Sequence, residues 1–221
     1  SVPNGNFGNV FAGHAARNCG LHIPKLLVAS NKNDILTQFF TSAEMKISEV
    51  IPTLSPSMDI QISSNLERFI FELFERDGEK VKNLFEKFRS DGNVKIDSEI
   101  EAKFSNSWAG YSFDDEAVVR CISSEAESSG VILDPHSAIG VLAAYSHRDK
   151  QIDPEIPIVC LATAHPAKFP KAVERALGEC PPLPDRLADL YERPEFFTQL
   201  PNDLEIVKDH VISCSRVDEN R

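Results

Sequence analysis

Apolar side chains recur at helical spacing in two stretches near the middle of the chain. The first stretch places them at i, i+3, i+4, i+7 and i+8, and the second repeats the first four of these positions after Asp77-Gly78. The apolar residues are Leu66, Phe69, Ile70, Leu73 and Phe74, followed by Val81, Leu84, Phe85 and Phe88. The pattern predicts two amphipathic helices whose aromatic stripe packs in the core.

Shorter patterns alternate between helix and strand along the rest of the chain. Helices are expected over residues 10–20, 35–40, 114–129 and 135–145, and strands over 25–30, 131–134 and 156–163. The run 156–163 is apolar at both alternating positions, which is typical of a strand buried on both faces of a parallel sheet. Residues 41–64 are expected to be mainly loop, and a helix-like segment at 185–191 precedes a charged tail. The alternation predicts an α/β fold in which helices flank a parallel sheet.

Charge and cysteine content narrow the range of partners and locations. The 221 residues carry 34 acidic and 23 basic side chains, so a nucleic acid or an anionic membrane surface would repel most of the chain. No apolar run reaches the roughly 18–20 residues that span a bilayer. The five cysteines are widely spaced and are expected to be reduced, which favours a cytoplasmic location. The chain opens on Ser-Val-Pro without a Met, so a removed targeting segment would not be visible.

A loop with two glycines precedes the first expected helix. Its sequence is Gly5-Asn6-Phe7-Gly8-Asn9. Unpaired backbone N–H groups and the positive end of the helix dipole favour a phosphate at such a place, and glycines let the backbone come close to the anion. The alternative is that the loop is only a turn, because many glycine-rich turns before helices bind nothing. No metal-ligand spacing or Gly-x-Ser-x-Gly signature accompanies the loop.

The same loop resembles the phosphate-binding loop of threonine synthases, which are enzymes dependent on pyridoxal 5′-phosphate (PLP). Four further segments continue the likeness in the same order along the chain. The matching segments are Ser1–Asn9, Ala29–Asp34, Thr53–Ile60, Asp134–Val141 and Leu161–Phe169. The resemblance implies a PLP-dependent fold type II enzyme, similar to the tryptophan synthase β-subunit. It implies that residues 1–165 form the C-terminal part of the PLP-binding large domain, with a helical insertion at 64–106, and that 166–221 form a C-terminal extension.

Individual roles follow from the resemblance at matching positions. Gly5, Asn6, Phe7 and Asn9 are expected to bind the PLP phosphate, and Gly8 to allow its close approach. Ser137 lies where the family places a hydroxyl against the pyridine nitrogen of PLP. A hydroxyl need not keep that nitrogen protonated, so the ring would be a tempered electron sink. Without the resemblance, Ser137 is more simply a serine at a helix start.

The substrate side rests on polar residues in two of the matching segments. Each of these residues is also an ordinary helix-cap or loop residue, so both interpretations stay open. The candidates for the substrate side are Asn33, Asp34, Ser55 and Asp59. His136 and His165 lie beside the motifs and are expected to be structural hydrogen-bonding residues.

One expected feature of the family is missing. The lysine that holds PLP lies in a Phe-Lys-Asp-type segment before the phosphate loop, and no segment of this chain matches it. We therefore expect a preceding half that carries this lysine to act as a partner, and the chain alone to be inactive. The whole protein would convert O-phosphohomoserine and water to threonine and phosphate. The alternatives are a related PLP-dependent dehydratase and a non-enzymatic threonine-synthase-like module that binds a phosphate ligand.

Overall fold

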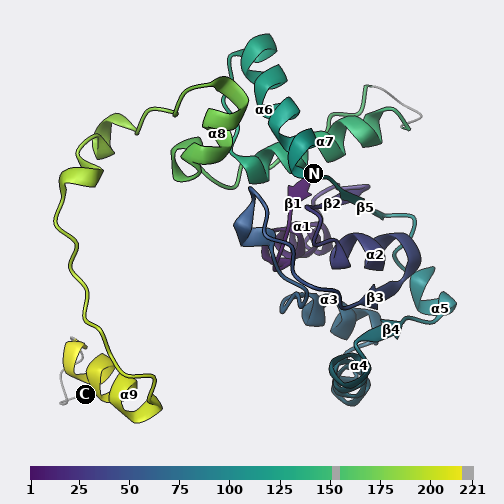
Figure 1. Ribbon diagram of the computed structural model, residues 1–221. Coiled ribbons are helices and arrows are strands. Elements are labelled where there is room, and N and C mark those ends of the chain that lie inside the picture. Colours follow the sequence, from purple (N-terminus) through teal and green to yellow (C-terminus); the bar gives the residue numbers. More distant parts are fainter. Residues whose placement is uncertain (151–154, 216–221) are drawn as a thin grey trace. The chain divides into compact units, whose positions relative to one another are not determined.

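The computed structural model describes residues 1–150 and 155–215 (Figure 1). The last six residues of the predicted extension 166–221 therefore lie outside the described residues. The chain divides into two compact units, Ser1–Pro182 and Leu183–Arg221. The domain boundary expected near residue 165 stays a prediction.

The first unit is built on a parallel sheet. Strands β1 (Val2–Pro3), β2 (Leu26–Ser30) and β5 (Trp108–Ser112) run in the order β1-β2-β5. Val2 pairs with Val28, and Leu26 pairs with Trp108. Every residue of β2 is buried, as expected for a central strand covered on both faces. The predicted α/β class with a parallel sheet is confirmed.

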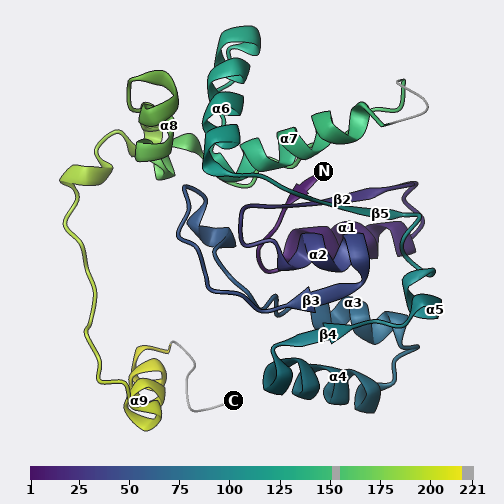
Figure 2. The same ribbon diagram turned by 45° about the vertical axis from the view of Figure 1, so that its right-hand side comes forward.

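Helices cover both faces of this sheet. In Figure 2, α1 (Gly8–Asn18) and α2 (Ile35–Ser42) lie on one face, and α7 (Pro135–Arg148) lies on the other. Neighbouring residues of β2 divide between these layers, because Val28 belongs to the core with α1 and α2 and Ala29 to the core with α7. The remaining helices of eight residues or more are α3 (Leu66–Leu73), α4 (Gly78–Asp91), α6 (Asp115–Ser129), α8 (Pro170–Leu177) and α9 (Leu204–Cys214).

The predicted helical insertion at 64–106 contains one strand as well as helices. Helices α3, α4 and α5 (Ser98–Glu101) lie within it, and its strand β4 (Asn93–Lys95) pairs antiparallel with β3 (Glu44–Lys46), which precedes the insertion. The two helices predicted from apolar spacing are present as α3 and α4, and the stripe of α3 is buried. Phe69 of α3 packs against Phe7, Phe40 and Trp108, and so joins the insertion to the sheet.

Two expected strands are not formed. Residues 131–134 run without regular structure into the start of α7, and Val131 is exposed. Residues 156–163 are also irregular. Their bonds to strand β1's neighbour Ser1 are two: the Ser1 amine donates to the Val159 carbonyl at 2.7 Å, and the Ser1 carbonyl accepts from the Leu161 N–H at 3.0 Å. Val159 is 71% exposed, so the expectation of a strand buried on both faces was wrong. The segment is apolar, as noted from the sequence, but among the described residues it pairs with no strand.

Strand β5 was missed by the sequence analysis, and its middle residue shows how tightly α2 covers it. A Cβ atom at Gly110 would lie 2.8 Å from the Cα and carbonyl oxygen of Thr37 in α2.

The second compact unit contains α9 and the short 3₁₀ helices η3 (Asp185–Leu187) and η4 (Leu190–Glu192). Within residues 1–150 and 155–215, no helix has the length and apolar character needed to cross a membrane.

Candidate functional site

The glycine loop connects β1 to α1 at the carboxyl end of the parallel sheet. Asn4 donates its N–H to the Ala29 carbonyl at 2.8 Å, which holds the loop beside the end of β2. The segments that follow β2 and β5 leave the sheet at the same edge. Ligands of open α/β sheets bind at this edge, so the loop occupies a favourable place for a site.

The loop presents a series of free backbone donors. The first bond of α1 is made by the Phe11 N–H to the Phe7 carbonyl at 3.1 Å. Among the described residues, no acceptor is found for the N–H groups of residues 5–10. The first turn of α1 also contains no acidic side chain. Free donors, the positive end of a helix and the absence of negative charge together suit an anion.

Phe7 fixes the shape of this loop. Its backbone is left-handed, with φ 62° and ψ 7°, which is uncommon for a bulky residue. Its ring is fully buried and stacks on Phe40 and Trp108, with centroid distances of 5.6 and 5.7 Å. The ring therefore cannot reach a ligand, and Phe7 offers only its backbone N–H.

Of the two glycines in the loop, Gly5 is the one that packs closely against other backbone atoms. A Cβ atom there would lie 2.7 Å from the Ser57 carbonyl oxygen and 2.9 Å from Met58 Cα. At Gly8 the nearest atom to a Cβ would be Asn65 Nδ2, at 3.8 Å. Gly5 thus packs the loop against residues 57 and 58, while the role of Gly8 toward a ligand stays a prediction.

The two asparagines of the loop differ in their surroundings. Asn6 Oδ1 accepts from the N–H and the hydroxyl of Ser64, at 2.8 and 2.7 Å, and the Asn6 carbonyl accepts from Asn65 Nδ2 at 2.8 Å. Asn9 is exposed. Residues 64 and 65 therefore support the loop from the start of the insertion, a contribution that the sequence analysis did not identify.

The start of α7 is organised around the buried carboxylate of Asp134. Its Oδ1 accepts from the backbone N–H and the ring Nδ1 of His136, both at 2.9 Å. Its Oδ2 accepts from the Ser137 N–H at 3.3 Å and from the Ser137 hydroxyl. Burial acts to raise the pKa of Asp134, but the hydrogen bonds from His136 and Ser137 outweigh burial and hold this pKa below its ordinary value. Asp134 is therefore ionised and only accepts hydrogen bonds.

These bonds join α7 to the wall of the glycine loop. The Ser57 N–H donates to His136 Nε2 at 3.3 Å, so Nε2 is the acceptor nitrogen of the ring. The ring proton is therefore on Nδ1, which donates a hydrogen bond to Asp134. Ser57 is the residue whose carbonyl packs on Gly5. Ser137 is buried, and its hydroxyl also accepts from the Thr163 N–H at 3.1 Å. Ser137 thus lies in the helix-start position considered from the sequence, and its contact with a ligand ring stays a prediction.

Three of the four candidate substrate residues meet in one network, in which Asn33 and Ser55 are buried and Asp59 is partly buried. Asp59 Oδ1 accepts from Asn33 Nδ2 at 3.0 Å, and it also accepts from Asn31 Nδ2 and the Thr53 hydroxyl, both at 2.7 Å. The Ser55 hydroxyl accepts from Asn31 Nδ2 at 3.0 Å. Asn31 and Thr53 were missed as individual residues, although both lie inside the matching segments. The network holds residues 51–59 in place beside Gly5.

Asp34, the fourth candidate, lies outside this network. It precedes α2 at the N-cap position, but its side chain makes no capping bond and accepts from Gln38 Nε2 at 2.8 Å. His165 accepts the Ala167 N–H on Nδ1 at 3.2 Å, which is the structural role expected of it. Among the described residues, no group of three or more His, Cys, Asp or Glu side chains is placed to hold a metal ion.

Comparison with known proteins gives one consistent family. Residues 137–211 match a family model described as "Threonine synthase, C-terminal". The chain is 45% identical over 205 residues to the threonine synthase of Pseudomonas aeruginosa, a match that covers 92% of this chain and 43% of that protein.

Solved structures agree with these sequence matches. A PLP-bound threonine synthase from Brucella melitensis superposes with a TM-score of 0.88 at 43% identity, covering 98% of this chain and 46% of that one. The yeast threonine synthase gives a TM-score of 0.84 at 36% identity, over 96% of this chain and 46% of that one. The predicted fold class is confirmed by both. The chain spans less than half of the length of these relatives.

Proposed function

Because the chain belongs to the threonine synthase family and corresponds to the C-terminal portion of its members, we propose that it supplies the phosphate-binding part of a PLP-dependent threonine synthase. The proposed reaction converts O-phosphohomoserine and water to threonine and phosphate. It requires the lysine-bearing portion that relatives have and this chain does not match. A cytoplasmic location belongs to the same proposal, as does the absence of nucleic-acid and membrane partners.

The residues of the glycine loop fit the phosphate of PLP. The observation that carries the proposal is the run of free N–H groups from residue 5 to residue 10 at the start of α1. Gly5, Asn6, Phe7, Gly8 and Asn9 would hold the phosphate mainly through these groups. The buried Phe7 ring and the packing of Gly5 on Ser57 hold the donors in place before any ligand binds.

Ser137 is proposed to face the ring nitrogen, and its hydrogen bonds change what it would do there. PLP supplies an electron sink for carbanions formed on the substrate. The Ser137 hydroxyl donates its one hydrogen bond to Asp134, and its oxygen accepts a hydrogen bond from the Thr163 N–H. Toward the ring nitrogen the hydroxyl could therefore act only as an acceptor, so it would favour a ring nitrogen that carries a proton. This revises the expectation of a tempered electron sink.

The network of Asn33, Ser55 and Asp59 is proposed to act on the substrate side by shaping residues 51–59. Its donors and acceptors bond largely to one another, so it orders the loop that packs on Gly5. Asp34 is proposed as a more exposed polar contact on the same side, since it does not belong to the network.

The test is reconstitution of activity from two parts. The chain would be combined with the part of the Pseudomonas aeruginosa threonine synthase outside the match, with PLP and O-phosphohomoserine, and threonine and phosphate would be measured. We expect both products from the mixture and neither from the chain alone. Turnover of serine or threonine instead would indicate a dehydratase, and PLP binding without any turnover would indicate a binding module.

A further inference from the structure

The second compact unit has no core of its own. Its described part, residues 183–215, is called the C-terminal unit below, and none of its residues is buried. Segments shorter than about 40 residues rarely fold alone without disulfides, metals or a partner. The cysteine of this unit, Cys214, is free. The C-terminal unit therefore needs a surface to pack against.

Helix α9 carries an apolar stripe suited to such packing. Leu204, Val207 and Val211 are spaced at i, i+3 and i+7, and Ile212 extends the stripe. Leu204 is 79% exposed, and the other three side chains are exposed as well. Asp209 and Ser213 lie on the opposite side of the helix by their spacing, where Ile206 is the one apolar residue. An exposed apolar stripe on one side of a helix is typical of a helix that docks on a partner.

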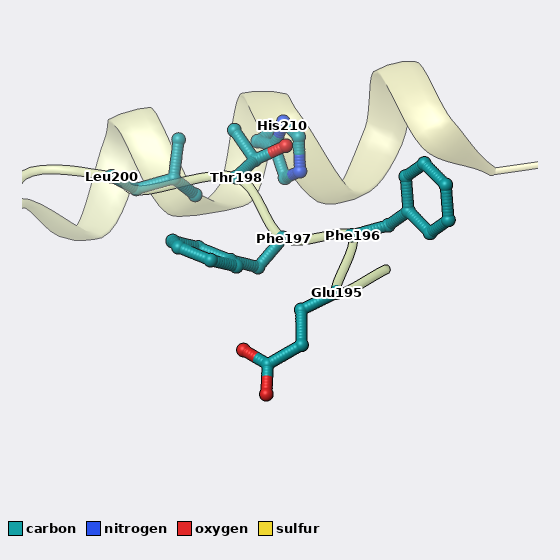
Figure 3. A pocket seen from close by; sticks show the side chains of 6 residues that line it. All are labelled: Glu195, Phe196, Phe197, Thr198, Leu200 and His210. Atoms are coloured by element: carbon teal, nitrogen blue, oxygen red, sulfur yellow. The ribbon is translucent and has the colours of Figure 1, made fainter. Parts of the chain in front are cut away.

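A second apolar element accompanies α9 within the same unit. Figure 3 shows Phe196 and Phe197 pointing away from each other along an extended segment, with Thr198 beside His210 of α9. The two rings are 91% and 80% exposed. They line a hollow together with Glu195, Thr198, Leu200 and His210. Large exposed aromatic rings beside a hollow are the residue types that dominate binding at protein interfaces.

We propose that α9 and Phe196-Phe197 form a docking surface for the portion of a threonine synthase that lies outside this chain. The inference rests on the proposed function, and it names the surface through which the C-terminal portion holds the rest of the enzyme. The matched family model runs to residue 211 and so includes Phe196, Phe197 and α9 as far as Val211. The Pseudomonas aeruginosa and Brucella melitensis relatives have more than half of their length outside the match, and that portion is available to cover the surface.

Charge argues against a second copy as the occupant. The C-terminal unit carries seven acidic and three basic side chains, and the whole chain has a net charge of -11. Two copies would bring like charges together around the apolar stripe, which disfavours their association. A different partner surface avoids this repulsion.

The experiment measures complex formation without requiring catalysis. The full chain would be co-expressed with the part of the Brucella melitensis threonine synthase outside the match, and the complex quantified by affinity purification and sedimentation. Leu204→Asn with Val211→Asn makes two of the four stripe positions polar without changing charge. Ser213→Asn alters the opposite side of the same helix, also without changing charge, and is the control; circular dichroism checks that both variants keep their helix content.

We expect a complex with the original chain and the control, and at least tenfold weaker association with the stripe variant. Equal association of all three chains would overturn the proposal, and so would the absence of a complex with any of them. Self-association of the chain that is lost in the stripe variant would assign the surface to a second copy instead. A complex that forms but binds no PLP would leave the docking surface standing and contradict the proposed function.

Discussion

Asp134 is the residue through which the start of α7 and the glycine loop are connected. Its carboxylate takes hydrogen bonds from His136 and Ser137, and His136 in turn takes the N–H of Ser57. When a buried carboxylate that accepts several hydrogen bonds loses its charge, its donors are left poorly paired, and the folded state is destabilised. The stability of the protein should therefore depend on pH.

Asp134→Asn is expected to lower the free energy of unfolding at pH 7 by about 2–3 kcal/mol, the size of a buried hydrogen bond to a charge. The pKa of Asp134 is held below the ordinary value of 3.8, so its stabilisation is present above that pH and is lost as the pH falls through the lowered pKa. The difference between the two proteins should therefore shrink below about pH 4. Urea unfolding followed by the fluorescence of Trp108, the single tryptophan, measures it; a difference that is the same at pH 3 and pH 7 would contradict the account.

Gly5→Ala tests the packing of the loop against residues 57 and 58. The new Cβ would meet the Ser57 carbonyl and Met58 Cα at distances that force the backbone to shift. We expect a loss of about 1–3 kcal/mol in the free energy of unfolding. Gly8→Ala is the matched control, because a Cβ there meets only Asn65 Nδ2 at an ordinary distance, and it should change stability by about 0.5 kcal/mol or less.

At the scale of elements, the aromatic contacts hold the insertion and the glycine loop on the sheet. Phe69 of α3 lies 4.7 Å from the Trp108 ring and 5.9 Å from the Phe7 ring, measured between centroids. The strained backbone of Phe7 is thus maintained by side chains from α2, α3 and β5. A change in α3 should be felt in the loop.

Phe69→Ala is expected to lower the free energy of unfolding by about 3–5 kcal/mol. It should also shift the amide NMR signals of residues 5–9, because Phe7 loses a packing partner. Phe71→Ala on the same helix removes a residue that is 37% exposed, so it should cost clearly less than Phe69→Ala and leave the loop signals in place. Unchanged loop signals in a folded Phe69→Ala protein would show that the loop keeps its shape without this contact.

The elements differ in how well the sequence predicted them. Helices α3 and α4 were predictable because nine apolar residues repeat a period that only a helix buries on one side. Strands β1, β3 and β4 have two or three residues each, which is too short for an alternating pattern. The expected strand at 156–163 was wrong because composition indicates a preference for burial and not whether a partner strand is present.

At the scale of the molecule, the described core lies within the first compact unit. Both buried clusters are formed by residues before Pro182, and the C-terminal unit contributes none. Removal of residues 183–221 keeps every residue of both clusters, so the truncated chain should still unfold cooperatively in urea. A truncated chain without a cooperative urea transition would contradict this.

The site was predictable only in part. The glycine spacing before a helix indicated the loop, and the family resemblance indicated its ligand. The bond between Ser57 and His136 joins residues 79 positions apart, and the support of Asn6 by Ser64 spans 58 positions. Contacts at such separations leave no local pattern in a single sequence, so the structure was needed to find them.

The most direct measurement is an amide NMR titration of the chain with pyridoxine 5′-phosphate, which has the phosphate and ring of PLP but no aldehyde to react with lysines. Unphosphorylated pyridoxine is the control. The account predicts that the signals of Gly5 to Asn9 shift with the phosphorylated compound and stay in place with the control. Signals in this loop that do not move, or that move equally with both compounds, would contradict the claim that the loop binds the cofactor phosphate.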